Sequence, residues 1–344
     1  MKIGIVTIYE SITNLGSFLQ AYALKTALES LGHDVYLIQN VSTLKTACKA
    51  VFKINPKREM FLRVKKAYKF ISDVKKVKLM PRGEINTSDL DVLIYGSDEI
   101  WNMDNPYFKD DLFWGTDSNK IDKIAYAVSI GAMSEETISQ NIQYTKELVN
   151  YKNILVRDDR TWEFVKKITG EEPDYVCDPT ILVPLESITK SIKLPKEKYM
   201  LVYTYGLDEP MIQNVVRYAR EHNLKIISPC FWHIWADEII ECSALQFSSL
   251  IAGAECVFTS TFHGAIFTLL NHKHCCILPV REKVTDIARR LGEDNHIIPY
   301  DCDYDRFSST MEIEFDDNEF EKRVKEWREK SFKLLKESLE CLEK

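Results

Sequence analysis

Short apolar runs rich in β-branched residues alternate with longer stretches of helical periodicity along almost the whole chain. Strands that are apolar on both faces and separated by helices form parallel sheets buried between helical layers. The sequence therefore predicts an α/β fold. The expected strands are residues 3–9, 34–38, 91–97, 123–131, 153–158, 199–206, 224–229, 255–260 and 274–279.

The chain is long enough for two such units, because its 344 residues exceed the roughly 100–200 residues of one domain. Between residues 179 and 198 the alternation lapses, and Pro179, Pro184 and Pro195 interrupt any long element. We expect one domain over residues 1–187 and a second over 188–344. Apolar residues at helical spacing from 318 to 344 predict a long amphipathic helix that crosses back toward the first domain.

Charge and cysteine content narrow the function classes. The formal net charge is -7, which gives no overall positive field to hold nucleic acid, so we expect no nucleic-acid partner. The longest apolar stretches fall short of the roughly 20 residues of a membrane-spanning helix. The 9 cysteines are scattered without a C-x-x-C pair, which favours reduced thiols in the cytoplasm over a disulfide framework.

The motif scan predicts neither a metal nor a cofactor. The usual signatures of dinucleotide-binding enzymes, P-loop nucleotidases, serine hydrolases and H-E-x-x-H zinc enzymes do not occur. Acidic residues between 301 and 312 have the spacing of a calcium loop, but Arg306 stands where its sharp turn needs Gly. His272 and His274 precede an apolar strand, where alternate residues are usually structural.

Residues 45–82 carry a local surplus of positive charge, with 13 Lys or Arg against only Glu59 and Asp73. Apolar residues recur every three or four positions, which predicts a basic amphipathic helix. Two interpretations stay open: a solvated outer face, or a face for an anionic membrane surface or acceptor.

The strongest candidate site is STFHG, Ser260 to Gly264, which follows an expected strand and opens an expected helix. A helix N-terminus directs free backbone N–H groups toward a ligand, and Ser260, Thr261 and Gly264 leave room for an anion there. His263 can donate a proton at neutral pH, although a structural role for this side chain is the alternative.

Two loops in the first half are further candidates. In NLGSFLQ, Asn14, Gly16, Ser17 and Gln20 follow the first strand, where an open parallel sheet binds its ligand; a simple helix cap is the alternative. In GSDEIWN, the residues after the strand combine polar groups with an aromatic ring, as sugar sites do, while the ring could equally be part of the core. The residues of this second loop are Ser97, Asp98, Trp101 and Asn102.

Two strand ends carry charged groups of a different kind. Arg157 could bind an anion through its guanidinium, whereas Asp178, which precedes a proline, has the position of a turn former.

An ordered set of motifs resembles the polysaccharide pyruvyl transferase family. The motifs are NLGSFLQAYAL, YGSDEIWN, YAVSIG, VRDD, CDPTIL and LIAGAECVFTSTFHGAIFTLL, and the resemblance spans about Lys2 to Gly292. It implies two Rossmann-like domains with parallel sheets facing a cleft, similar to the GT-B architecture. It also implies a transferase of exopolysaccharide biosynthesis that moves the pyruvyl group of phosphoenolpyruvate onto two sugar hydroxyls of a surface glycan as a ketal.

The resemblance assigns roles to the candidate residues. The catalytic acid is His263, the donor side comprises Ser260, Thr261, Gly264, Lys283 and Arg157, and the acceptor side comprises Asn14, Gly16, Ser17, Gln20, Ser97, Asp98, Trp101 and Asn102. The implied partners are phosphoenolpyruvate and a glycan, which could be lipid-linked and met at the inner face of the membrane through residues 45–82.

This chain departs from the family pattern at one place. Where the pyruvyl transferases that it resembles have Arg two residues before the His, this chain has Thr261, while Lys283 matches a related downstream Arg. A hydroxyl does not replace a guanidinium. A glycosyltransferase using a nucleotide-sugar and a non-catalytic glycan-binding protein therefore stay open as alternatives.

Overall fold

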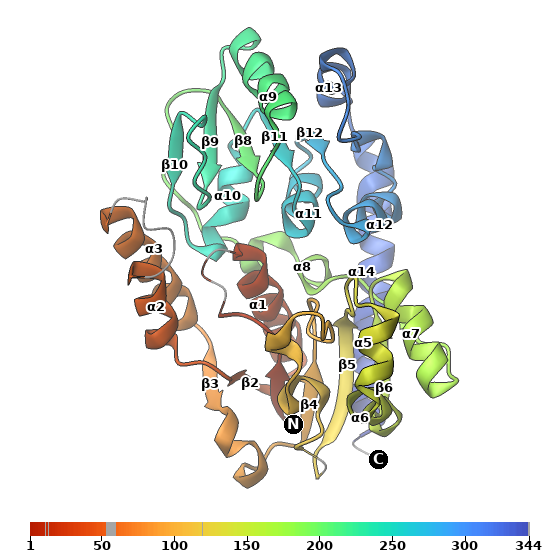
Figure 1. The fold of residues 1–344 in the computed structure, drawn as a ribbon. Coiled ribbons are helices and arrows are strands. Elements are labelled where there is room, and N and C mark those ends of the chain that lie inside the picture. Colours follow the sequence, from red (N-terminus) through yellow and green to blue (C-terminus); the bar gives the residue numbers. More distant parts are fainter. Residues whose placement is uncertain (11, 13, 53–59, 119, 343–344) are drawn as a thin grey trace.

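The computed structural model describes residues 1–10, 12, 14–52, 60–118 and 120–342, which form two parallel sheets with helices around them (Figure 1). The first sheet has the order β3-β2-β1-β4-β5-β6-β7, and all its neighbouring strands run parallel. The α/β prediction is confirmed. Its strands are β1 (Lys2–Val6), β2 (Asp34–Gln39), β3 (Lys78–Pro81), β4 (Val92–Tyr95), β5 (Asp122–Val128), β6 (Asn153–Val156) and β7 (Asp174–Tyr175).

The second sheet has the order β10-β9-β8-β11-β12 and is also parallel throughout. Each expected apolar run contains one strand, whereas the sequence reading missed β3, β7 and β10. These three lie at sheet edges, where a strand is half solvated and lacks a continuous apolar run. The strands of this sheet are β8 (Tyr199–Tyr203), β9 (Lys225–Pro229), β10 (Glu238–Ile240), β11 (Cys256–Thr259) and β12 (His274–Ile277).

Helices connect the parallel strands and bury their apolar faces on the sheets. In α1, for example, Phe18, Leu19, Leu24 and Leu28 belong to the core together with residues of β1 and β2. The helices of the first half are α1 (Leu15–Ser30), α2 (Thr43–Phe52), α3 (Met60–Val74), α4 (Asp111–Trp114), α5 (Glu135–Gln140), α6 (Ile142–Thr145), α7 (Asp159–Thr169) and α8 (Pro179–Leu182). Those of the second half are α9 (Glu209–Glu221), α10 (Phe247–Ala252), α11 (Phe262–Leu270), α12 (Glu282–Leu291), α13 (Tyr304–Met311) and α14 (Asp317–Glu340).

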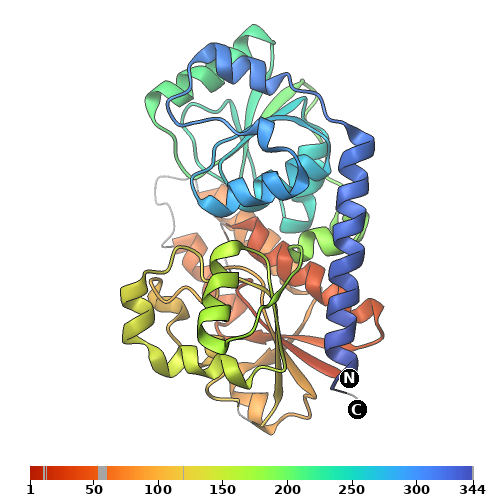
Figure 2. The ribbon, with the colours of Figure 1, turned by 90° about the vertical axis from the view of Figure 1, so that its right-hand side faces the viewer.

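The long helix α14 starts beside the second sheet and runs down along the first (Figure 2). Its Ser331 accepts a hydrogen bond from the Cys177 backbone N–H at 2.9 Å, and Ser338 accepts one from the Asn153 side chain at 2.7 Å. Phe320, Val324, Leu335 and Leu339 are buried on its inner face. Helix α14 thus packs against both halves of the chain, contacting α8 of the first half and α12 of the second.

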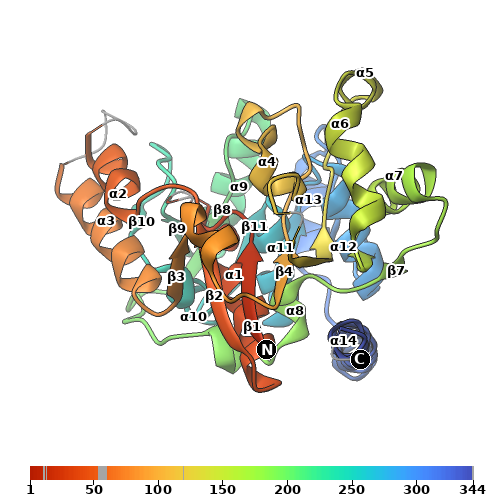
Figure 3. The ribbon, with the colours of Figure 1, turned by 90° about the horizontal axis from the view of Figure 1, so that it is seen from below.

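The basic segment 45–82 differs from the single helix that the sequence predicted. It forms the helices α2 and α3 and then strand β3, while residues 53–59 lie outside the described residues. The helices pack together at the β3 edge of the first sheet (Figure 3). Strand β3 pairs with β2 and so extends the first sheet by one strand.

The α2–α3 pair also contacts the second half. Lys66, which is buried, donates to the Cys230 carbonyl at 3.0 Å, and Lys69 donates to Gln246 Oε1 at 2.8 Å. The surplus of positive charge therefore serves in part to join the two halves of the chain.

Candidate active site

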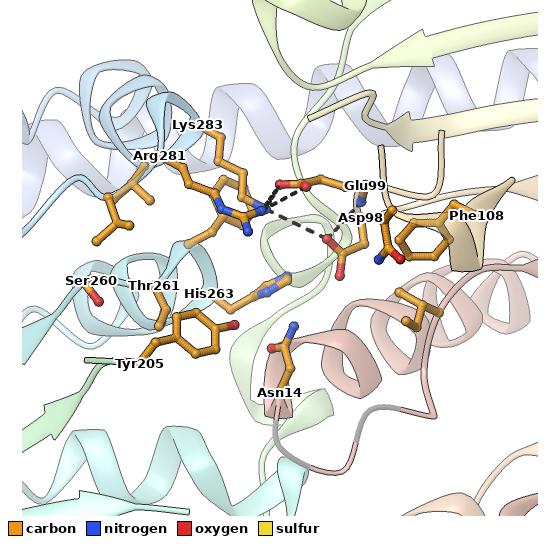
Figure 4. Close-up of a pocket in the computed structure, with 15 residues that line it drawn as sticks. Asn14, Asp98, Glu99, Phe108, Tyr205, Ser260, Thr261, His263, Arg281 and Lys283 are labelled. Atoms are coloured by element: carbon orange, nitrogen blue, oxygen red, sulfur yellow. Dashed lines mark hydrogen bonds and ion pairs between the residues drawn. The ribbon is translucent and has the colours of Figure 1, made fainter. Parts of the chain in front are cut away.

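A pocket of about 480 Å³ lies between the two sheets (Figure 4). The residues around it follow β1, β4, β8, β11 and β12, so the carboxyl ends of both sheets face it. Strand order reverses between β1 and β4 and between β8 and β11, which is where open parallel sheets bind ligands. The pocket is lined by Ile8, Asn14, Asp98, Glu99, Asn105, Phe108, Tyr205, Ser260, Thr261, Phe262, His263, Val280, Arg281, Lys283 and Val284.

The predicted STFHG site forms one wall of this pocket. Thr261 caps helix α11, because its Oγ1 accepts a hydrogen bond from the Gly264 backbone N–H at 3.0 Å. A Cβ atom on Gly264 would lie 2.2 Å from Thr259 Oγ1, so only glycine fits behind the cap. Ser260 Oγ lies 2.5 Å from Thr204 Oγ1. Thr261 therefore shapes the start of the helix rather than presenting a free hydroxyl.

His263 lies in the first turn of α11, and its imidazole points into the space between Asn14 and Asp98 (Figure 4). The side chain is only 5% exposed. Its Nε2 has no hydrogen-bond partner among the described residues and is 3.8 Å from Asp178 Oδ2, too far for a hydrogen bond. A buried ring nitrogen without a hydrogen bond destabilises the folded protein unless a ligand supplies the missing partner.

Behind the imidazole lies a buried ionic cluster. Arg157 donates to Asp178 Oδ2 and to Ser97 Oγ, each at 2.6 Å. Burial raises the pKa of Asp178. The opposite effects of His263, Arg157 and the Thr180 hydroxyl are larger together and bring this pKa well below its ordinary value. Asp178 is therefore an anion behind the imidazole.

Arg157, predicted on the donor side, is tied into this cluster and does not line the pocket. Its guanidinium lies 4.7 Å from the Phe262 ring centre. Burial lowers the pKa of Arg157, but Asp178 and Asp98 outweigh that effect and raise it above its ordinary value. Arg157 therefore balances buried carboxylates next to the pocket.

Asp98 lies at the pocket with its backbone in the left-handed region, at a φ of 69°. Few non-glycine residues adopt that conformation, and those that do concentrate at functional sites. Its Oδ1 accepts a hydrogen bond from the Glu99 backbone N–H at 2.9 Å and lies 3.9 Å from Lys283 Nζ. This turn directs the carboxylate across the pocket from His263 (Figure 4).

Two pocket residues that sequence reasoning missed are Glu99 and Arg281. Arg281 Nη1 lies 2.9 Å from both carboxylate oxygens of Glu99, and Lys283 Nζ lies 2.7 Å from Glu99 Oε1. Burial raises the pKa of Glu99, but Lys283 and Arg281 lower it to about 2. The sequence signal was limited to an arginine two residues before Lys283, since the partners are 182 positions apart.

Tyr205, after β8, was also missed. Its side chain is 62% exposed at the pocket, and its ring meets that of Phe231 edge to face at a 5.1 Å centroid distance. It supplies an aromatic surface of the kind that the sequence reading sought in Trp101.

Several predicted acceptor residues do not reach the pocket. Trp101 has no exposed surface, stacks on Trp114 and donates to the Phe113 carbonyl, so it belongs to the core as the alternative reading had it. Asn102 donates to Glu99 Oε2 at 3.3 Å.

Ser17, Gln20 and Ser97 are fully buried and act within the loops behind the pocket. The Gln20 amide donates to the carbonyl of Ile8 and to the Thr7 hydroxyl, and its Oε1 accepts from the Ser97 backbone N–H at 3.1 Å. These contacts hold the β1 and β4 loops together. Gly16 packs against His263, which makes its role steric.

The sequence of the chain matches a known family over most of its length. The family model described as polysaccharide pyruvyl transferase covers residues 14–281. The chain belongs to the polysaccharide pyruvyl transferase family. The family is one of transferases, and it implies a glycan acceptor. No curated protein matches the chain.

Solved structures with little sequence similarity share the fold of this family member. UDP-GlcNAc 2-epimerase from Methanocaldococcus jannaschii superposes with a TM-score of 0.54 at 12% identity, covering 92% of this chain and 93% of the other. The enzyme from Neisseria meningitidis bound to UDP-GlcNAc gives 0.54 at 9% identity, covering 98% and 99%. At such identities the likeness establishes a GT-B-like fold alone.

Within the described ranges, no group of three or more His, Cys, Asp or Glu side chains is placed to hold a metal ion. No described helix has the length and apolarity that crossing a bilayer requires.

Proposed function

We propose that this family member transfers the pyruvyl group of phosphoenolpyruvate onto two hydroxyls of one sugar residue in a glycan. The acceptor lies on residues 1–187 and the donor on residues 188–344. The methylene carbon of the donor gains a proton, both sugar oxygens bond to the adjacent carbon, and inorganic phosphate leaves with the remaining hydroxyl proton. The product is a cyclic ketal, and atoms balance without an oxidant or a cofactor.

His263 carries this proposal. It lines the pocket, is almost fully buried, and its Nε2 has no hydrogen-bond partner among the described residues. The carboxylate of Asp178 lies behind it, with Oδ2 at 3.8 Å from Nε2. A histidine side chain that faces a ligand can act as the general acid that delivers the proton to the methylene carbon.

Cations near His263 support an anionic donor. Arg281 and Lys283 line the same pocket, and the backbone at the start of α11 faces it from the side of Ser260 and Thr261. Arg281 supplies a guanidinium although Thr261 stands where related enzymes have Arg. The donor carboxylate and phosphate thus have charged partners within one pocket.

The acceptor side centres on Asp98 and Asn14, which face His263 across the pocket (Figure 4). The Asp98 carboxylate can accept the proton of an attacking sugar hydroxyl, while the exposed ring of Tyr205 offers a surface for the apolar face of a sugar.

A direct assay tests this function. Purified protein is incubated with phosphoenolpyruvate and a panel of methyl hexosides, and inorganic phosphate and ketal are measured. Acceptor-dependent release of phosphate together with a ketal supports pyruvyl transfer. Release of a nucleoside diphosphate from a nucleotide-sugar would favour the glycosyltransferase alternative, and binding of glycan without turnover would favour the non-catalytic one.

We further propose that the acceptor is lipid-linked and that the protein meets it at the cytoplasmic face of a membrane. The support is the outer face of α2 and α3, defined by Leu44, Lys45, Lys49, Phe52, Phe61, Val64, Lys65 and Tyr68, all of which are exposed. The one acidic residue in the described parts of these helices, Asp73, is buried. Exposed aromatic rings interspersed with lysines suit an anionic lipid surface. None of the nine cysteines, all of which belong to the described residues, forms a disulfide, in keeping with a reducing compartment.

A further inference from the structure

Glu99 links the two halves of the chain at the middle of the pocket. It follows β4 of the first sheet, whereas Arg281 and Lys283 follow β12 of the second. Arg281 Nη1 contacts both oxygens of Glu99 at 2.9 Å, and Lys283 Nζ contacts one of them at 2.7 Å. A single carboxylate from one half thus forms ion pairs with two cationic side chains of the other half.

This arrangement opposes the binding of an anionic donor. The side chain of Glu99 is 10% exposed and that of Lys283 is 17% exposed, so water screens their attraction poorly. With Asp98 and Glu99 facing Arg281 and Lys283, the pocket holds as many carboxylates as side-chain ammonium and guanidinium groups. An entering phosphate or carboxylate meets cations that already have a partner.

The cations have the freedom to exchange that partner. The Arg281 side chain is 62% exposed, so its guanidinium can turn without opening the core. Lys283 Nζ lies 3.9 Å from Asp98 and 5.1 Å from the Phe262 ring centre, and these groups continue to hold it when Glu99 leaves. Beyond the Glu99 contact lies a smaller recess, lined by Arg160 and also by the carboxylates of Asp158, Glu282 and Asp286.

We propose that Glu99 is a specificity-determining residue that acts as an internal anion: it occupies Arg281 and Lys283 in the donor-free protein, and an anionic group of the donor takes its place. The inference rests on the proposed function only for the identity of the donor. Binding of any phosphate-sized anion at this pair breaks the Glu99 contact and thereby couples donor entry to the link between the halves. Weakly anionic ligands fail to displace Glu99 and are rejected.

Binding of inorganic phosphate, measured by calorimetry on the full chain, tests this inference. Glu99→Gln keeps the size of the side chain and removes its charge, so phosphate should bind about tenfold more tightly or better than to the wild type. The double variant Glu99→Gln with Arg281→Gln should lose that gain. Glu147→Gln is the matched control, because Glu147 is a half-buried partner of Lys123 away from the pocket, and it should leave the affinity unchanged.

The outcomes separate this inference from the proposed function. Equal or weaker phosphate binding by a folded Glu99→Gln variant, or no binding by either protein, would overturn the displacement of Glu99. Tighter phosphate binding without any pyruvyl transfer would instead overturn the proposed donor and leave the role of Glu99 standing. Circular dichroism of each variant establishes that it is folded.

Discussion

Gly16 and His263 touch across the boundary between the two halves of the chain. A Cβ atom built on Gly16 would lie 2.1 Å from His263 Nδ1 and 2.5 Å from His263 Cβ. The first turn of α1 thus packs directly against the imidazole. Glycine at this position leaves the space that the ring occupies. The orientation of the proposed acid therefore depends on both halves being docked together.

Gly16→Ala should lower turnover at least tenfold, because the new methyl group forces the imidazole out of position. Overpacking of this kind also costs about 1–3 kcal/mol of stability. Steady-state kinetics and thermal unfolding measure the two effects. Gly83→Ala is the control, since nothing lies within 4 Å of a Cβ at Gly83, and it should change neither quantity. Unchanged kcat in Gly16→Ala would contradict the claim that packing against Gly16 orients the imidazole of His263.

His263→Ala should reduce kcat by about a hundredfold or more, the scale of losing a general acid, with little change in Tm. His272→Ala serves as the control, because His272 is held by Asp317 and Glu321 on the surface of α14 and lies outside the pocket. A His263→Ala variant with wild-type turnover would show that the proton comes from another group.

Thr261→Val should destabilise the protein by about 0.5–2 kcal/mol, because the α11 cap to the Gly264 N–H is lost. Thr261→Ser keeps the hydroxyl and should stay close to the wild type. Donor KM should change little in both variants if Arg281 supplies the guanidinium. A large rise in KM for Thr261→Val, with none for Thr261→Ser, would mean that the threonine hydroxyl itself holds the donor.

The Glu99 contact should make stability depend on pH. The folded protein holds the pKa of Glu99 at about 2, below its ordinary value of 4.5. A lowered pKa contributes stability that is present above the ordinary value and is lost as pH falls toward the folded value. The Tm of wild type should therefore exceed that of Glu99→Gln at neutral pH, and the difference should shrink as pH falls below about 4.5. A difference independent of pH would contradict the ion pair.

The outer face of α2 and α3 should bind vesicles that contain anionic lipid, and salt should weaken the binding. Changing Lys45, Lys49 and Lys65 to Glu should reduce it strongly in a sedimentation assay, because all three are exposed. Lys66 and Lys69 are unsuitable for this test, since they contact the second half. Equal binding by wild type and the triple variant would favour a merely solvated face.

The buried strands could be predicted because their apolar, β-branched runs are encoded locally. The edge strand β10 could not, since only Glu238–Ile240 pair with β9. The place of His263 at the pocket could be predicted because a strand end followed by a helix start is visible in the sequence. Trp101 was predicted on the acceptor side but lies in the core. The sequence does not show whether an aromatic residue beside polar ones packs inward or faces the pocket.

The ion pair of Glu99 with Arg281 could not be predicted for a different reason. Its partners come from different sheets and meet only when the two halves dock, so no local pattern marks them. The same holds for Gly16, because a Cβ atom there would meet the side chain of His263 from the second half.

The most direct measurement of the central claim is the fate of the donor methylene group in heavy water. Wild-type protein, phosphoenolpyruvate and a methyl hexoside acceptor are incubated in D₂O, and the product is followed by NMR. We predict acceptor-dependent phosphate release and a ketal whose methyl group carries one solvent deuterium, with both signals lost in His263→Ala. A ketal formed at an undiminished rate by His263→Ala, or no ketal from any acceptor while a nucleotide-sugar is consumed, would contradict the account.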